Sequence, residues 1–143
     1  MRSLLDVNVL LALLDANHIH HGLAMDWWRD HHARGWASCP LTQNGALRIL
    51  SGASYLNRQA PGVVADRLSM ATSQASHEFW NASFSLIEPG IVRWDRVTGS
   101  RQLTDIYLLA LAVKNDGRLV TLDKRITVEP VSGAKPKNLL TLS

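Results

Sequence analysis

Residues 2–14, RSLLDVNVLLALL, change from a strand pattern to a helix pattern at a single acid, Asp6. The residues from Arg2 to Leu5 favour a short buried strand, and from Val7 onward apolar side chains recur at helical spacing. Asp6 therefore stands at the carboxyl end of a strand, which is where ligands bind in open α/β sheets. This stretch predicts an α/β fold and makes Asp6 the first candidate site residue.

The rest of the chain continues this alternation of short strands and amphipathic helices. We expect further strands at residues 36–39, 84–87, 118–122 and 138–142, and helices at residues 19–33, 40–50, 62–75 and 105–114. Alternating strands and helices favour a mainly parallel central sheet. A chain of 143 residues has the usual length of one domain, so we expect residues 1–143 to form a single domain.

The composition excludes several classes of protein. Hydrophobic residues make up 46% of the chain and charged residues 19%, which is typical of a folded globular protein. The single cysteine, Cys39, excludes an intrachain disulfide and a multi-cysteine metal site, and it fits a reducing cytoplasm. The apolar run from Val7 to Leu14 is too short to cross a membrane, and Asp6 does not suit a secretion signal. We therefore expect a soluble cytoplasmic protein without a membrane partner.

Asp outnumbers Glu among the acids, and Arg outnumbers Lys among the bases. The chain has 15 Lys+Arg against 12 Asp+Glu, a formal net charge of +3, which is compatible with a nucleic-acid partner without establishing one. Nine of the acids are Asp, a poor helix former, and eleven of the bases are Arg, which recognises phosphate through two parallel hydrogen bonds. This choice of residues raises the possibility that some aspartates bind a ligand.

Two further aspartates occupy positions like that of Asp6. Asp123 follows the strand expected at 118–122, and Asp105 lies in the first turn of an apolar helix that we expect Thr104 to cap. Three carboxylates that converge on one point repel one another unless a cation lies between them, and Mg²⁺ or Mn²⁺ suits oxygen ligands. The alternative, that each acid separately caps a helix or pairs with an arginine, stays open at this point.

Four segments in order resemble the motifs of PIN-domain ribonucleases, in particular the VapC-type toxins of bacterial toxin–antitoxin pairs. They are LLDVNVL at 4–10, CPLTQNGALR at 39–48, TDIYLLALA at 104–112 and VTLD at 120–123. The lead GSRQ at 99–102 strengthens the likeness to VapC toxins, and the match runs from residue 3 to the tail. No single segment decides the resemblance, but four in register make it strong.

The resemblance implies a fold, an activity and partners. The fold is a three-layer α/β/α domain whose central, mainly parallel sheet has four or five strands. The activity is that of a Mg²⁺-dependent endoribonuclease that cuts structured RNA, such as transfer RNA or ribosomal RNA. A cognate antitoxin silences the enzyme, and two copies of the chain form a homodimer.

The resemblance also assigns roles to residues. Asp6 and Asp105 are the principal metal ligands, and Asp123 completes the site directly or through water. Asn8 holds the carboxylate of Asp6, and Thr104 supports Asp105 in the same way. For Asn8 a purely structural role, bonding backbone at the start of a helix, is as well supported by the sequence.

Gln43 departs from the family pattern. Many relatives have Glu at the corresponding place among the catalytic residues, and an amide cannot take a proton or neutralise a cation. We therefore expect weaker metal affinity than at a four-acid site, and occupancy by one ion. The alternative function is a PIN-like module that binds RNA or a protein partner and cuts it weakly or not at all.

Two other classes of enzyme fit the sequence less well. A haloacid-dehalogenase-like phosphatase needs a second Asp two positions after the first, where this chain has Asn8. A dinucleotide-binding enzyme needs a Gly-x-Gly-x-x-Gly turn after the first strand, which is absent.

Phosphates of the substrate can be held by arginines near the pocket. The candidates are Arg48, Arg96, Arg101 and Arg125, with Arg101 best placed because it precedes Asp105.

Overall fold

The computed structural model describes residues 1–143 and contains one five-stranded sheet. The strands are β1 (Ser3–Leu5), β2 (Trp36–Ser38), β3 (His77–Phe79), β4 (Arg118–Thr121) and β5 (Leu139–Thr141). They lie in the order β3-β2-β1-β4-β5, and every neighbouring pair is parallel. The expectation of a parallel sheet is confirmed. β1 and β4, the strands that precede Asp6 and Asp123, lie side by side at its centre.

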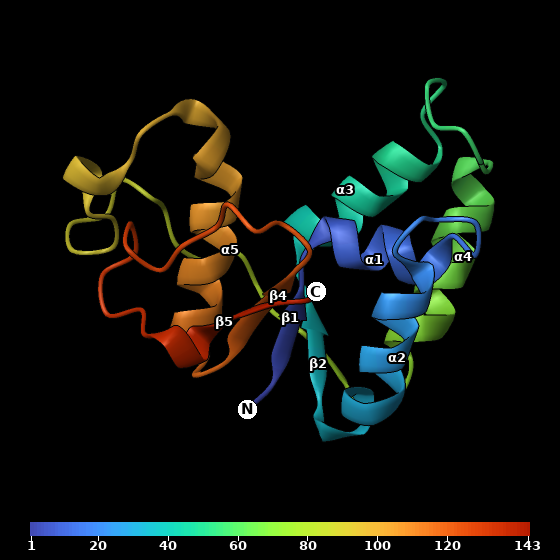
Figure 1. Ribbon diagram of the computed structural model, residues 1–143, viewed down its shortest axis with the longest axis horizontal. Helices are drawn as coiled ribbons and strands as arrows, with labels where there is room; N and C mark the ends of the chain where they lie inside the picture. Colours follow the sequence, from blue (N-terminus) through green and yellow to red (C-terminus); the bar gives the residue numbers. More distant parts are fainter.

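Helices cover both faces of this sheet. They are α1 (Val7–Leu14), α2 (His21–His31), α3 (Pro40–Leu50), α4 (Pro61–Thr72) and α5 (Leu103–Lys114). Short 3-10 turns occupy His32–Arg34, Trp94–Arg96, Ser100–Gln102 and Pro136–Asn138. Figure 1 shows α5 alone on one side of the sheet and α1 to α4 on the other. The three-layer α/β/α fold is therefore confirmed. None of the helices has the length and hydropathy needed to span a membrane.

The alternation of side chains along the strands divides the core in two. Leu4 and Leu119 face α5, in a cluster that also contains most of the buried side of that helix. Leu5 and Val120, one position further along, face the opposite way and pack against α1, α3 and α4. Successive side chains of a strand point to opposite faces of the sheet, so a strand as short as β1 can serve both cores. Its carboxyl end is consequently held rigidly from both sides.

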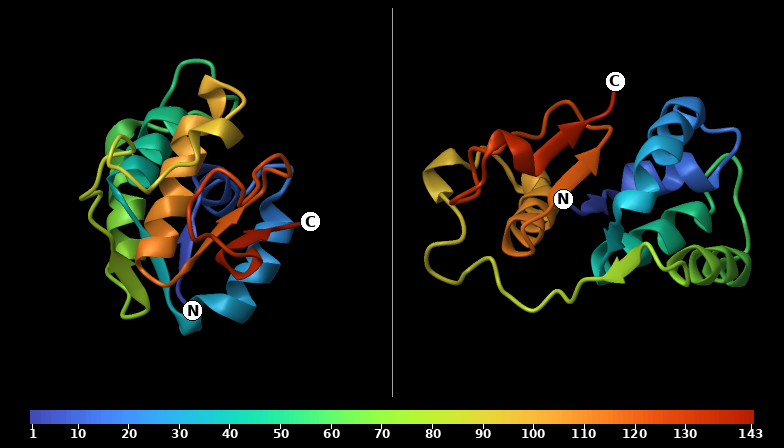
Figure 2. Two further views of the ribbon diagram at one scale, coloured as in Figure 1. Left: turned by 90° about the vertical axis from the view of Figure 1, so that its left-hand side faces the viewer. Right: turned by 90° about the horizontal axis from the view of Figure 1, so that it is seen from below.

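The strand expected at 84–87 is wrong. The edge strand is β3, whose His77 pairs with Trp36 of β2. Phe84 is instead buried against α5, where its ring stacks on Tyr107 at a centroid distance of 4.4 Å and its carbonyl oxygen accepts a hydrogen bond from the Tyr107 hydroxyl at 2.9 Å. Figure 2 shows the chain after β3 crossing from the α4 side of the molecule to the α5 side. Residues 84–87 therefore form an irregular segment whose Phe84 packs in the core, although their apolar pattern predicts a strand.

The start of α5 also differs from expectation. The helix begins at Leu103 directly after the 3-10 turn, so Thr104 lies inside the first helical turn and does not cap it. Gln102 organises this entry instead, since its Oε1 accepts hydrogen bonds from the backbone N–H groups of Thr98 and Gly99 at 2.7 and 3.2 Å. Asp105 remains in the first turn, as expected.

Candidate active site

Asp6 is fixed at the junction of β1 and α1. It is the N-cap of α1, with its Oδ1 accepting the N–H of Val7 at 2.7 Å. Its Oδ2 accepts the hydroxyl of Thr121 at 2.7 Å, and its backbone N–H donates to the carbonyl of Val120 at 2.9 Å. Although only 5% of the residue is exposed, the carboxyl group contacts no cation. Burial is the main cause that raises the pKa of Asp6, and the charge of Asp123 raises it further.

Asn8 and Thr121 hold this junction together. The Asn8 amide nitrogen donates to the hydroxyl oxygen of Thr121 at 3.2 Å and, at a longer 3.4 Å, to Oδ2 of Asp6. The Asn8 Oδ1 accepts the backbone N–H of Leu122 at 3.0 Å. Asn8 thus combines its two suggested roles, since it contacts both the carboxylate of Asp6 and the backbone beyond β4. Thr121 was not among the predicted site residues, although a polar residue at the end of a buried strand is a signal for one.

Asp105 lies across from Asp6 without a partner. Its carboxylate forms no hydrogen bond and no ion pair, although the residue is partly buried in the first turn of α5. Burial raises its pKa to about 6, and the negative charges of Asp6 and Asp123 contribute to this rise. The structure therefore brings the three acids close together, since the charges of Asp6 and Asp123 act on Asp105 and that of Asp123 acts on Asp6.

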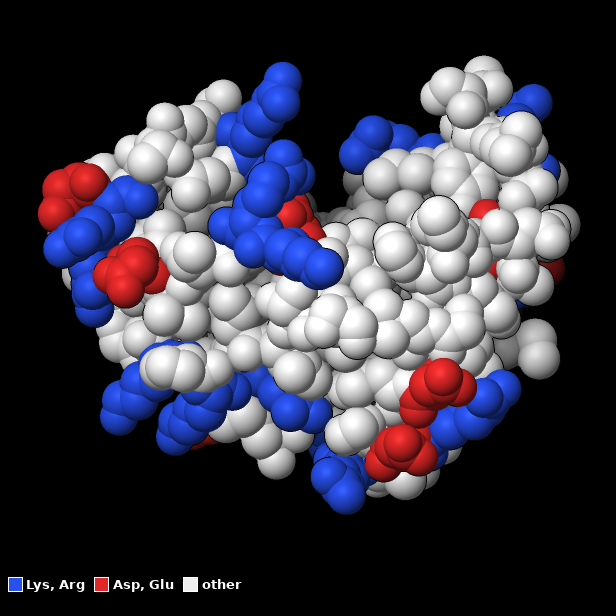
Figure 3. Space-filling view, viewed as in Figure 1, with Lys and Arg blue, Asp and Glu red and all other residues white.

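Asp123 is paired with Arg125. The Nε and Nη2 atoms of Arg125 donate to the two oxygens of Asp123, each at 3.0 Å, and this bonding lowers the pKa of Asp123. Asp105, Asp123, Arg101 and Arg125 line one pocket of about 260 Å³. Figure 3 shows the molecule notched between its two lobes, with basic side chains on both rims and acidic atoms beside basic ones between them.

The chemistry of these donors suits a hard divalent cation. The three acids offer only oxygen atoms, the ligands that Mg²⁺ and Mn²⁺ prefer, and Asp105 has no ion-pair partner. No group of three His, Cys, Asp or Glu side chains is arranged closely enough to hold an ion at once. The donor set fits a metal, whereas its arrangement needs at least one side chain to turn.

Gln43 faces the end of β2 and not the three acids. Its Nε2 donates to the hydroxyl oxygen of Ser38 at 2.9 Å, and that oxygen lies 2.8 Å from Nε2 of His77. Because β2 neighbours β1, this group lies one strand away from Asp6. The amide adds no charge to the pocket in this conformation.

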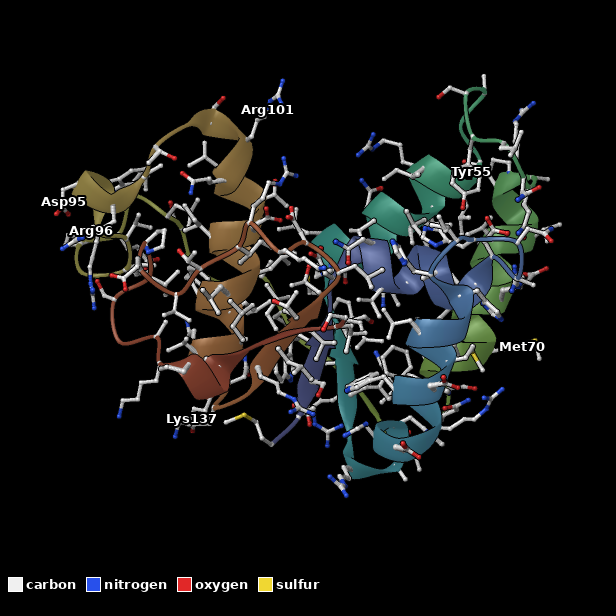
Figure 4. The ribbon with its side chains drawn as sticks, in the orientation of Figure 1. Tyr55, Met70, Asp95, Arg96, Arg101 and Lys137 are labelled. Atoms are coloured by element: carbon white, nitrogen blue, oxygen red, sulfur yellow. The ribbon has the colours of Figure 1, made fainter.

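The remaining candidates fall into different places. Arg101 is exposed at the pocket, beside the start of α5 (Figure 4). Arg48 lines a separate shallow depression between α3 and α4. Arg96 is no part of the pocket: it lies at the outer edge of the molecule with Asp95, its ion-pair partner at 3.7 Å (Figure 4). Thr104 is exposed and its side chain forms no hydrogen bond, because the helix begins before it.

Comparisons with known proteins give consistent relatives. Ribonuclease VapC44 of Mycobacterium tuberculosis is 45% identical over 142 residues, which cover 99% of this chain and 100% of the relative. Ribonuclease VapC39 of the same organism is 39% identical over 134 residues, 93% of this chain and 96% of that one. No family model matches the chain.

Two solved structures share the fold at low sequence identity. One is VapBC2 from Rickettsia felis bound to a DNA fragment from their promoter, with a TM-score of 0.66, 10% identity and full coverage of both chains. The other is Mycobacterium tuberculosis VapC20, described as a sarcin-ricin loop cleaving toxin, with a TM-score of 0.58 and 17% identity. The latter match covers 81% of this chain and 85% of VapC20.

Proposed function

Because the chain belongs to the VapC family of PIN-domain ribonuclease toxins, we propose that it cuts RNA at the pocket around Asp6, Asp105 and Asp123 with the help of a divalent cation. One observation carries the proposal. Asp105 is a partly buried carboxylate without any partner, its pKa raised to about 6, and it lies near two further acids. An unpaired carboxylate of this kind destabilises the fold, and a bound cation would relieve that destabilisation.

The proposed cation is Mg²⁺, with Mn²⁺ as the alternative, and Asp6, Asp105 and Asp123 would hold it. When bound, the ion would polarise the scissile phosphate and lower the pKa of an attacking water. The protein holds two of these acids with different firmness. Val7 and Thr121 fix the Asp6 carboxylate before any ion arrives, whereas Asp105 is free to turn. We therefore expect Asp6 to set the position of the site and Asp105 to complete it.

Gln43 weakens this site compared with one that has four acids. Its amide can orient water or offer an oxygen, but it cannot neutralise charge or accept a proton at neutral pH. The hydrogen bond from its nitrogen to Ser38 keeps it at the end of β2. We expect one bound ion with modest affinity.

The proposed substrate is structured RNA, either transfer RNA or ribosomal RNA, cut to leave 5′-phosphate and 3′-hydroxyl ends. Three features support it. VapC20, a structural neighbour, is described as cleaving the sarcin-ricin loop. The chain has a net charge of +3 although two of its acids, Asp105 and Asp123, line one pocket and the charge of Asp6 acts on Asp105. Arg101 at the rim can hold a phosphate next to that pocket.

The proposed partners are a cognate antitoxin and a second copy of the chain, acting in the cytoplasm. The antitoxin is supported by VapBC2 from Rickettsia felis, in which toxin and antitoxin are solved together. A homodimer is supported by the exposed apolar side chains of α4, since Val63 is 50% and Met70 is 74% exposed. Light scattering on the purified chain measures this directly: we expect twice the mass of one copy.

The decisive experiment maps RNA ends. The protein is purified with the antitoxin encoded next to it, released, and incubated with total RNA in Mg²⁺ or in EDTA. We expect discrete 5′ ends only with Mg²⁺, and none from the Asp6→Ala and Asp105→Ala variants. An absence of discrete ends above the Asp6→Ala background contradicts the proposal.

The same experiment tests a second function. Because Gln43 leaves the site with a neutral amide, the chain fits a role as an RNA-binding or antitoxin-binding module that cuts weakly or not at all. Tight RNA binding without cleavage under any divalent ion supports this role. Cleavage that depends on Asp6 and Asp105 excludes it.

A further inference from the structure

Arg125 is bonded to Asp123, one of the three carboxylates proposed to bind the metal ion. It lies in the turn after β4, at the wall of the pocket. Its backbone N–H and its Nε donate to Oδ1 of Asp123 at 2.9 and 3.0 Å, and its Nη2 donates to Oδ2 at 3.0 Å. Both oxygens of Asp123 are therefore engaged from within the same turn.

Arg125 is also the only cation paired with any of the three acids. Asp6 accepts hydrogen bonds from neutral donors, and Asp105 has no partner. The charge of Arg125 acts on Asp105 as well, since it lowers the pKa that burial and the other acids raise. No group of three such donors is gathered around one point in this arrangement, in which Arg125 is bonded to Asp123.

The hold of Arg125 on Asp123 is weak. The arginine side chain is 84% exposed, against 20% for Asp123, and its guanidinium donates to no other group. An exposed ion pair contributes little, because water and salt screen it. A divalent cation has twice the charge of a guanidinium and, when bound, would also be held by Asp6 and Asp105. Arg125 is therefore displaceable, and once displaced it remains at the pocket near Arg101.

From this geometry we infer that Arg125 is an exchangeable internal counter-ion: it neutralises Asp123 while the pocket lacks a metal, and it moves onto a phosphate of the RNA when an ion takes its place. A guanidinium suits both positions because its planar donors match a carboxylate and a phosphate equally well. The inference rests on the proposed function and adds the residue that links metal binding to RNA binding.

The test separates the two roles by measuring each one. Mn²⁺ affinity is measured by electron paramagnetic resonance on the full chain without RNA, for wild type and Arg125→Gln. The KM and kcat for RNA cleavage are measured at saturating Mg²⁺. Arg96→Gln is the matched control, because Arg96 is another exposed arginine paired with a neighbouring aspartate, but it lies outside the pocket.

We expect Arg125→Gln to bind Mn²⁺ about two- to fivefold more tightly, in keeping with the loss of a weak exposed pair, and to raise KM about threefold or more. The kcat of Arg125→Gln should stay within about twofold of wild type. The Mn²⁺ affinity and KM of Arg125→Lys should lie between those of wild type and Arg125→Gln, since Lys keeps the charge without the two parallel donors. Arg96→Gln should change neither quantity.

Two results overturn the inference. Unchanged or weaker Mn²⁺ affinity shows that Arg125 does not compete with the ion, and unchanged KM shows that it does not reach the RNA. A wild-type chain that binds Mn²⁺ but cuts no RNA contradicts the proposed function instead, and the Mn²⁺ titration of Arg125→Gln still tests the competition. Circular dichroism of each variant verifies its fold.

Discussion

Helix α1 begins and ends on a buried aspartate, and the two ends behave in opposite ways. Asp6, 5% exposed, and Asp15, 4% exposed, each accept hydrogen bonds from neutral donors. At Asp15 these come from the Tyr55 hydroxyl at 2.5 Å, the Asn17 backbone N–H at 3.0 Å and the Asn57 amide at 3.4 Å. The pKa of Asp15 is lowered, chiefly by Tyr55, while that of Asp6 is raised.

The two aspartates are equally little exposed, but their hydrogen bonds offset burial to different extents. At Asp15 the hydrogen bond from Tyr55 outweighs burial, whereas at Asp6 burial outweighs the hydrogen bonds and the charge of Asp123 adds to it. Around Asp15 the segment after α3 closes over the end of α1, and Arg67 of α4 also donates to the carbonyl of Leu14 and to Gln59. Around Asp6 the neighbours are two more acids. A buried carboxylate that is satisfied by neutral donors joins parts of the fold, whereas one crowded by other carboxylates is a candidate for cation binding.

The largest expected effect contrasts the two acids directly. Asp6→Asn should lower the rate of RNA cleavage roughly 100-fold or more, because it removes a proposed metal ligand. The asparagine still caps the helix, so unfolding in urea should show no loss of stability. Single-turnover cleavage rates measure the effect, with Asp15→Asn as the matched control at a temperature where both variants are folded. Equal loss of activity in the two variants removes the distinction between the two ends.

Tyr55→Phe should weaken the fold and leave cleavage intact. The substitution removes a hydrogen bond to a buried carboxylate, which contributes about 1.5–3 kcal/mol. The free energy of unfolding, measured in urea, should fall by that amount. Tyr107→Phe provides the comparison, because the Tyr107 hydroxyl donates to an uncharged carbonyl and its loss should cost about 0.5–1.5 kcal/mol. A larger loss in Tyr107→Phe than in Tyr55→Phe contradicts the account of Asp15.

The pH dependence of stability should have opposite signs at Asp105, which lies near Asp6, and at Asp15. The folded chain holds a proton on Asp105 up to about pH 6, whereas the unfolded chain releases it near pH 4, so this group reduces stability as pH rises between those values. Asp15, whose pKa is lowered, contributes stability above about pH 4 that is lost as pH falls further.

Asp105→Asn isolates the first of these contributions. Because solvent screens this partly exposed group, we expect the variant to gain about 1 kcal/mol over wild type between pH 4.5 and pH 7. Urea unfolding at the two pH values measures the gain, and Mn²⁺ should stabilise wild type more than the variant at pH 7. A difference between wild type and variant that does not change with pH contradicts the raised pKa of Asp105.

The smallest expected effect is at Gln43. Gln43→Glu should tighten Mg²⁺ binding about threefold and increase the cleavage rate, because it adds a negative charge at the end of the neighbouring strand. Gln74→Glu, which adds the same charge at an exposed position after α4, is the control. Unchanged affinity and rate in Gln43→Glu show that the amide does not limit the site.

The sequence predicted the end of the sheet where the acids gather, but not how they are arranged. The pattern change at Asp6 and the strand before Asp123 both show in a local window, so their places at strand ends follow from periodicity. Local periodicity does not show which strands are neighbours. It therefore missed the bond from Thr121 to Asp6, and it predicted a strand at 84–87, where Phe84 instead packs on α5.

The roles of the other acids depended on partners far away in the chain. Nothing in the sequence around Asp15 indicates that Tyr55 and Asn57 enclose it. Asp123 and Arg125, by contrast, are only two positions apart, yet whether they pair depends on the turn after β4. The residue types fix the available chemistry, and the tertiary contacts decide whether an aspartate stabilises the fold or remains free for a ligand.

The most direct measurement of the central claim is anomalous X-ray scattering from crystals soaked in Mn²⁺. We expect one Mn²⁺ peak at the pocket, bonded to Asp6 and Asp105 and, directly or through water, to Asp123, with Arg125 turned away from Asp123. A peak elsewhere, or no peak at saturating Mn²⁺, would contradict this arrangement.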